Sequence, residues 1–226
     1  MRTCHNIGHY ARAVEENLTG RVIQKTGAGI LPVDIVREDN GYKIFMTQGQ
    51  ISFGDILRDE TLTLLIQALK IKPEALQENF PVQIVSTGHS KVMVGIQNTE
   101  LLHRLSPDME KLKELSQIID CNGFYVFTMN TQEKDILIHG RMFAPAIGIN
   151  EDPVTGNANG PLGAYLVHHR KVKHDGASFS FKAMQGEAIK RAGIMDVYVK
   201  IEAHEPVEVK IAGHAVIAFK DDLTMA

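Results

Sequence analysis

Residues 140–170 read GRMFAPAIGINEDPVTGNANGPLGAYLVHHR, and the rest of the chain is organised around them. An extended, partly β-branched segment leads into the Glu-Asp-Pro tripeptide at 151–153, and a Thr-Gly-Asn turn follows it. Leu162 and Leu166 then lie one helical turn apart in an apolar run. The stretch therefore predicts a strand, a tight loop and a helix over 155–170.

The start of this predicted helix has the features of an anion site. Asn157 or Asn159 can cap the helix, and Pro161 is tolerated in a first turn, where its missing N–H costs nothing. The free backbone N–H groups of such a helix start attract anions, and Asp152 stands just before them. One group that polarises a substrate and one that moves a proton are what carbon-acid chemistry needs. Asp before Pro is also common turn chemistry, and a Gly/Asn-rich loop often only caps a helix, so the local pattern leaves both readings open.

Composition bounds the class of protein. At 226 residues and 44% hydrophobic content, the chain can bury the core of one large or two small domains. A net charge of -3 with scattered lysines and arginines argues against a nucleic-acid partner. Cys4 and Cys121 are too few for a disulfide framework, and neither a membrane-span-length apolar run nor the h-region of a signal peptide occurs. We therefore expect a soluble cytoplasmic protein with no membrane partner.

Residues 151–158, Glu-Asp-Pro-Val-Thr-Gly-Asn-Ala, resemble the Glu-Asp-Pro-[Val/Ala]-Thr-Gly-Ser-Ala signature of the PhzF-like (phenazine-biosynthesis) isomerase family, whose fold is shared with diaminopimelate epimerase. Other stretches resemble landmarks of that family and occur in the family's order. They are KTGAGIL at 25–31, TGH at 87–89, GRMFAP at 140–145, QG at 185–186 and RAG at 191–193. The resemblance covers nearly the whole chain.

The resemblance implies an α+β fold of two pseudo-symmetric lobes, each a curved, mainly antiparallel sheet around one central helix. The two central helices would be 5–17 and 155–170. The chain would divide into a partial first lobe at 1–57 and a second lobe at 58–204, with 205–226 returning to the first. We expect the first lobe to be incomplete, because the family's opening segments, including a catalytic glutamate, have no counterpart in this sequence.

Periodicity and turn residues predict the remaining elements. The expected strands are 21–25, 29–36, 42–48, 80–87, 91–96, 124–127, 135–143, 179–184 and 194–202, with a last hairpin over 206–219 across Gly213-His214; the expected helices are 60–70, a turn at 100–104, and a helix capped by Ser106 that runs to Ile119.

The resemblance also implies functional residues. Asp152 would serve as acid/base or substrate orienter, and the amides around Gly156, Asn157 and Ala158 would hold a substrate carboxylate. His5 aligns with the histidine that opens the family's first central helix. An alternative alignment places Gly8-His9 at that position.

Gly88 and His89 form a loop that borders the substrate pocket in the family, and a plain turn between strands is an equal alternative. No second His or Cys stands at ligand spacing from His89, so no metal site is expected. The sequence contains no phosphate loop or dinucleotide fingerprint, which favours a reaction without cofactor.

The leading hypothesis is a cofactor-independent isomerase or epimerase that transfers a proton on a small carboxylate or an amino-acid-derived molecule. Asn157 stands where the family has serine, and the absent glutamate weakens the expected activity. A two-cysteine racemase is a weaker alternative, because the loop facing the Cys4 segment contains no second thiol. A non-catalytic binding or assembly protein of the same fold is the alternative from another class. A homodimer is expected, as is usual in the family.

Overall fold

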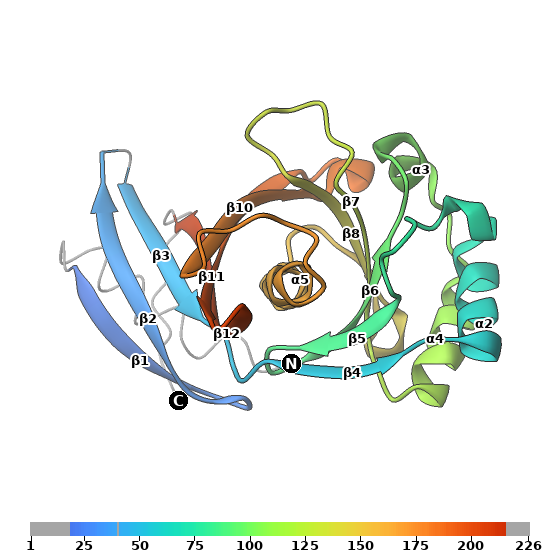
Figure 1. The fold of residues 1–226 in the computed structure, drawn as a ribbon, viewed down its shortest axis with the longest axis horizontal. Coiled ribbons are helices and arrows are strands. Elements are labelled where there is room, and N and C mark those ends of the chain that lie inside the picture. Colours follow the sequence, from blue (N-terminus) through green and yellow to red (C-terminus); the bar gives the residue numbers. More distant parts are fainter. Residues whose placement is uncertain (1–18, 40, 216–226) are drawn as a thin grey trace, which may run out of the picture.

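The computed structural model describes residues 19–39 and 41–215, and their strands form one strongly curved sheet (Figure 1). The strands are β1 (Gly20–Thr26), β2 (Gly29–Glu38), β3 (Gly41–Thr47), β4 (Ser52–Ile56), β5 (Gln83–Ser86), β6 (Ser90–Gly95), β7 (Phe124–Thr128), β8 (Ile138–Ala144), β9 (Ile149–Asp152), β10 (Ser178–Gln185), β11 (Gly193–Glu202) and β12 (Glu205–Ala215). The α-helices are α2 (Asp59–Leu69), α3 (Thr99–Arg104), α4 (Met109–Ile118) and α5 (Gly156–His168), and short 3-10 turns are η1 (Pro73–Ala75), η2 (Pro145–Ile147) and η3 (Glu187–Ile189). The helix expected over 5–17, with His5, lies outside the described residues.

The described strands run in the order β1-β2-β3-β12-β11-β10-β8-β7-β6-β5-β4, and β9 pairs with β8 beside this path. The β6–β7 and β8–β10 pairs are parallel, and the other described pairs are antiparallel. Figure 1 shows the sheet curving around α5, which is seen end-on at its centre. The expected α+β class, with a curved and mainly antiparallel sheet around a central helix, is confirmed.

Helix α5 lies at the centre of the larger hydrophobic core. Residues 158–167 are all buried, because the surrounding strands enclose the helix on every side. A Cβ added at Gly163 would lie 2.8 Å from Val197 and 2.9 Å from Val199, so this glycine lets β11 approach the helix closely. Among the described residues no helix is both long and apolar enough to cross a lipid bilayer.

Two details of the predicted α5 are wrong. Thr155 occupies the N-cap position, so neither Asn157 nor Asn159 caps the helix. Pro161 therefore lies inside the helix instead of in its first turn. The proline cannot donate to the carbonyl of Asn157, but Asn157 is exposed, so water can satisfy that carbonyl.

Helices α2, α3 and α4 cover the other side of the sheet, to the right in Figure 1. Their apolar residues form a second core with the outward-facing side chains of β6, β7 and β8. The helices contribute Leu65, Leu69, Leu112 and Leu115, and the strands contribute Val92, Val94, Phe124, Val126 and Phe143. Helix α4 is capped by Asp108, whose side chain accepts a 3.2 Å hydrogen bond from the Lys111 N–H. The expected Ser106 cap is wrong, because an aspartate that caps equally well stands two residues nearer the helix.

Strands β1, β2 and β3 form a wing that joins the rest of the sheet through β12, which pairs with both β3 and β11. The expected hairpin across Gly213-His214 is wrong, because Gly213 pairs with Ile44 inside the β12–β3 ladder. The chain reverses earlier, at Ala203 and His204, whose φ values are +50° and +66°. Strand β4 pairs with β5, away from the wing, and the domain division near residue 57 stays a prediction.

Candidate functional site

Asp152 ends β9, and three residues separate it from the first residue of α5. Its Oδ2 atom accepts a 2.5 Å hydrogen bond from the hydroxyl of Thr155. No hydrogen bond joins the other carboxylate oxygen, Oδ1, to any residue that the structure describes. Among the described residues, the half-buried Asp152 therefore has one oxygen anchored by Thr155 and one oxygen that accepts no hydrogen bond.

Gln185, at the end of β10, holds the loop in this shape. Its Nε2 donates to the Asp152 carbonyl oxygen at 2.6 Å and to the Thr155 hydroxyl oxygen at 3.0 Å. Its Oε1 accepts from the Thr155 N–H at 3.2 Å and from Asn159 Nδ2 at 3.1 Å. The Gln185 side chain is almost completely buried and uses both its donor and its acceptor capacity on the loop and on α5. The sequence shows the Gln-Gly pair but gives no sign of this role, because the partners of Gln185 lie more than 25 residues away.

Asn159 extends the network into the core. Its Oδ1 accepts a 2.6 Å hydrogen bond from the hydroxyl of Tyr125, and its Nδ2 also donates to the Thr155 carbonyl at 3.0 Å. Burial raises the pKa of Tyr125 against the opposing effect of the Asn159 bond, so the phenol stays a donor. A Cβ added at Gly140 would lie 2.1 Å from the Tyr125 hydroxyl, so only glycine lets the tyrosine reach Asn159.

Two more glycines fix the loop from its other side. Gly186 has φ +86°, and a Cβ there would lie 2.7 Å from the Pro153 carbonyl oxygen. A Cβ at Gly193 would lie 2.5 Å from Cγ2 of Val154. The Gln-Gly and Arg-Ala-Gly segments around Gly186 and Gly193 thus pack directly against the loop that carries Asp152.

Glu151 points away from this network and serves the scaffold. Arg141 donates to it in bidentate fashion, from Nε at 2.9 Å and from Nη2 at 2.7 Å. Nη1 of Arg141 donates to the carbonyl oxygens of Leu102 and Leu105, at the end of α3. Both charged side chains are only 9% exposed, so the pair joins β8, β9 and α3 inside the protein.

The first backbone N–H groups of α5 follow Asp152 closely along the chain, since β9 ends at Asp152 and α5 begins at Gly156. The Ala158 N–H already donates to the Thr155 carbonyl at 3.2 Å. The N–H groups of Gly156 and Asn157 have no carbonyl partner within the helix, because they belong to its first turn. They form the positive end of the helix dipole. A Cβ at Gly156 would lie 2.1 Å from Ile211, so β12 packs tightly against this helix start.

Gly88 and His89 form the turn between β5 and β6. Gly88 has φ +118°, and a Cβ there would lie 2.7 Å from Ala28 in the β1–β2 turn. His89 is exposed. No hydrogen bond joins Gly88 or His89 to Asp152 or to the first turn of α5, and their role in substrate binding stays a prediction. His5, the other predicted catalytic residue, lies outside the described part of the chain.

Comparison with known proteins identifies relatives of this chain. The model of the family described as "Phenazine biosynthesis-like protein" (PhzC-PhzF) matches residues 6–221. An uncharacterized isomerase of Clostridium acetobutylicum is 60% identical over 218 residues, which are 96% of this chain and 72% of the relative. The trans-2,3-dihydro-3-hydroxyanthranilate isomerase of Pseudomonas fluorescens is 29% identical over 153 residues, 67% of this chain and 49% of the relative. The crystal structure of a Bacillus anthracis PhzF-family phenazine biosynthesis protein has a TM-score of 0.79 at 28% identity, covering 95% of this chain and 73% of that one.

A curved, mainly antiparallel sheet around one central helix is the diaminopimelate epimerase-like class of fold. Within that class, the chain belongs to the PhzF-like family. The Clostridium and Pseudomonas relatives are both named as isomerases, and the expectation of the family from its Glu-Asp-Pro-Val-Thr-Gly loop is confirmed.

Proposed function

We propose that this protein is an isomerase or epimerase that works without a cofactor on a small carboxylate or an amino-acid-derived substrate. In the proposed reaction, Asp152 removes a proton from the carbon next to the substrate's carboxyl group. After exchange with solvent, the protonated Asp152 supplies a proton to another carbon, or solvent supplies one to the other face of the same carbon, so the formula of the substrate is conserved.

The proposal rests on the hydrogen bonding of Asp152 and its loop. The Oδ1 atom of Asp152 accepts no hydrogen bond from the described residues, and the loop that carries it leads directly into the first N–H groups of α5, while Thr155 and Gln185 hydrogen-bond the rest of the loop. Removing a proton next to a carboxyl group builds negative charge on its oxygens, and fixed N–H donors at a helix start stabilise such charge. A carboxylate base is typically worth about two to four powers of ten in rate when it is placed within reach of its proton.

The comparisons support the reaction class. The Clostridium relative is named an isomerase, and the Pseudomonas relative is named for isomerising trans-2,3-dihydro-3-hydroxyanthranilate, a cyclic amino acid by that name. A cyclic or aromatic amino acid is therefore a sensible first substrate class to test.

The test is solvent deuterium incorporation, followed by NMR, across a panel of small carboxylates and amino-acid derivatives. The wild-type chain should exchange at least one compound, and Asp152→Asn should lower that rate by about 100-fold or more. Glu110→Gln, which removes an exposed carboxylate on α4, should leave the rate unchanged.

Exchange at equal rates in wild type and Asp152→Asn would remove Asp152 from the mechanism. Ligand line broadening without any exchange would favour the non-catalytic binding protein of the same fold.

A further inference from the structure

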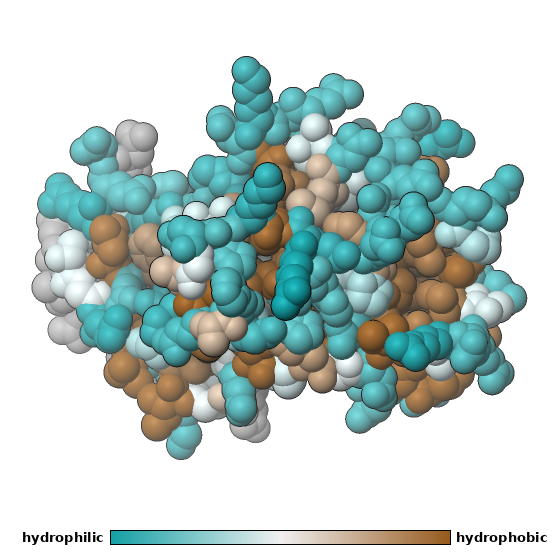
Figure 2. All heavy atoms as spheres, in the orientation of Figure 1, coloured by the Kyte–Doolittle hydropathy of each residue, from teal (hydrophilic) through white to brown (hydrophobic). Residues whose placement is uncertain are grey.

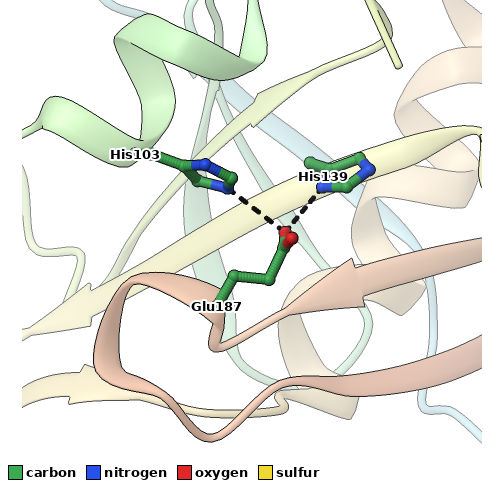
Figure 3. Close-up of side chains that lie close together, drawn as sticks. All are labelled: His103, His139 and Glu187. Carbon is green, nitrogen blue, oxygen red and sulfur yellow. Dashed lines mark hydrogen bonds and ion pairs between the residues drawn. The ribbon is translucent and has the colours of Figure 1, made fainter. Parts of the chain in front are cut away.

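His103, His139 and Glu187 lie close together (Figure 3). On β8, His139 shares a face with Phe143, which belongs to the core under α2 and α4 and not to the core around α5. His103 comes from α3, His139 from β8 and Glu187 from η3. The Glu187 Oε2 atom lies 2.6 Å from His139 Nδ1 and 3.3 Å from His103 Nε2. One atom of each side chain lies within 4.8 Å of the others, so three potential metal ligands converge on one point.

His139 is oriented as a metal-binding histidine would be. Its side chain is only 2% exposed, and its Nε2 atom lies 3.0 Å from the Glu133 carboxylate, on the side of the ring away from the cluster. Without an ion, His139 Nδ1–H donates to Glu187 Oε2 at 2.6 Å. An ion would replace that proton, and the Glu133 carboxylate, which accepts from Nε2–H, would then fix the tautomer whose Nδ1 lone pair binds the ion. This carboxylate–histidine arrangement is the usual outer partner of a metal-bound imidazole.

The spacing suits a small divalent ion. Zn²⁺ binds imidazole nitrogen and carboxylate oxygen at about 2.0–2.2 Å, which sets tetrahedral ligands about 3.4 Å apart. The His103–Glu187 distance already matches this spacing. The shorter His139–Glu187 distance can widen, because the Glu187 side chain is 25% exposed and stands on a short turn.

The surroundings leave room for an ion and its remaining ligand. A solvent-open cavity of about 430 Å³ surrounds the cluster and is also lined by the polar residues Asn98, Thr99, Glu100, Asn130 and Gln132. Catalytic-type zinc sites combine three protein ligands with a water molecule in the fourth position. Two imidazoles disfavour Mg²⁺ and Ca²⁺, which prefer oxygen ligands.

We propose that His103, His139 and Glu187 bind a divalent transition-metal ion, best matched by Zn²⁺, with Glu133 as the outer partner of His139. The bound ion would join α3, β8 and η3. It would also steady the Asp152 loop, because Gly186, immediately before Glu187, packs against the Pro153 carbonyl. The proposal does not depend on the proposed enzyme function, since the ligands lie outside the Asp152 network.

The first test is isothermal titration of chelator-treated, tag-free protein with ZnCl₂. The wild-type chain should bind one ion tightly and show a higher Tm with zinc. His103→Gln and Glu187→Gln should each weaken binding by more than about 100-fold, and Glu133→Gln by about 10- to 100-fold. The side chains of His103 and Glu187 are both partly exposed, so their variants should keep the fold, which circular dichroism can check.

The matched control is His214→Gln, which breaks an exposed two-residue contact with Glu38 at 3.0 Å and should leave zinc affinity unchanged. Co²⁺ in place of Zn²⁺ should give visible d–d absorption that disappears in His103→Gln. Absence of tight binding, or equal binding in wild type and the ligand variants, would overturn the proposal and leave the cluster as a hydrogen-bonded ion-pair network.

Discussion

At the scale of single residues, the candidate site depends on Gln185 as much as on Asp152. Asp152 could be chosen from its place in a loop before a helix. Gln185 could not, because its importance comes from four hydrogen bonds to residues 26 to 33 positions away. The buried amide supplies donors to one side and an acceptor to the other, which no other side chain of its size can do.

Gln185→Glu tests this directly, because it preserves the shape and the acceptor while removing the two donors. We expect the free energy of unfolding to fall by about 1–3 kcal/mol at pH 7, since the Asp152 carbonyl loses its partner and faces a negative charge. Urea denaturation should show a smaller loss at pH 5, where protonation of the introduced, buried carboxyl restores one donor.

Gln67→Glu is the matched control, an exposed glutamine on α2 whose replacement should change stability by less than about 0.5 kcal/mol. A loss for Gln185→Glu as small as that of the control would show that the network contributes little.

At the scale of elements, the buried Arg141–Glu151 pair ties three elements together. Arg141 belongs to β8, Glu151 to β9, and the accepting carbonyls of Leu102 and Leu105 mark the end of α3. Glu151 is part of the family's loop signature, and the structure gives it a scaffold role next to Asp152. Two adjacent acidic residues thus serve different purposes, because successive residues of a strand point to opposite faces.

Removing one partner of this pair should be costly. Glu151→Gln leaves the Arg141 charge buried without its counter-charge, so we expect about 3–5 kcal/mol less stability in chemical denaturation. The Arg104–Glu100 pair on α3 offers the comparison, because both its side chains are at least 75% exposed and lie 3.2 Å apart. Glu100→Gln should cost no more than about 0.5 kcal/mol. Similar losses for both variants would contradict a buried-charge effect.

At the scale of the whole molecule, the wing of β1–β3 presents apolar side chains to solvent. Ile23 and Ile30 are 63% and 70% exposed, and Val36 is 42% exposed. Cross-strand register places all three on one face of the β1–β2 hairpin, opposite the buried Val33. Figure 2 shows apolar atoms gathered at the lower left, over these strands. Exposed apolar patches of this kind mark interaction surfaces, and β1 is an edge strand of the described sheet.

We expect this face to pair with a second copy of the chain. Light scattering after gel filtration should give twice the 25.0 kDa of one chain for the wild type. The double variant Ile23→Glu/Ile30→Glu should shift the mass to that of a single chain. Ile118→Glu, at a 62% exposed isoleucine on α4, should not. A wild-type mass of 25.0 kDa would rule out the dimer.

Features that depend on near neighbours along the chain could be predicted from the sequence. Alternation and turn residues predicted β1, β2, β3, β7, β10 and β11, and the helical period predicted α2 and α5, because side chains two to four positions apart share a face. The family and the Asp152 loop followed from an eight-residue signature. Contacts between residues far apart in the chain could be found only in the folded structure. His103 lies 36 positions before His139, and Glu187 lies 48 positions after it. Such separations do not match the short spacings typical of metal ligands, so the sequence argued against a metal site. The curvature of the sheet and the packing of α3 bring them together, and a linear pattern does not record those long-range contacts.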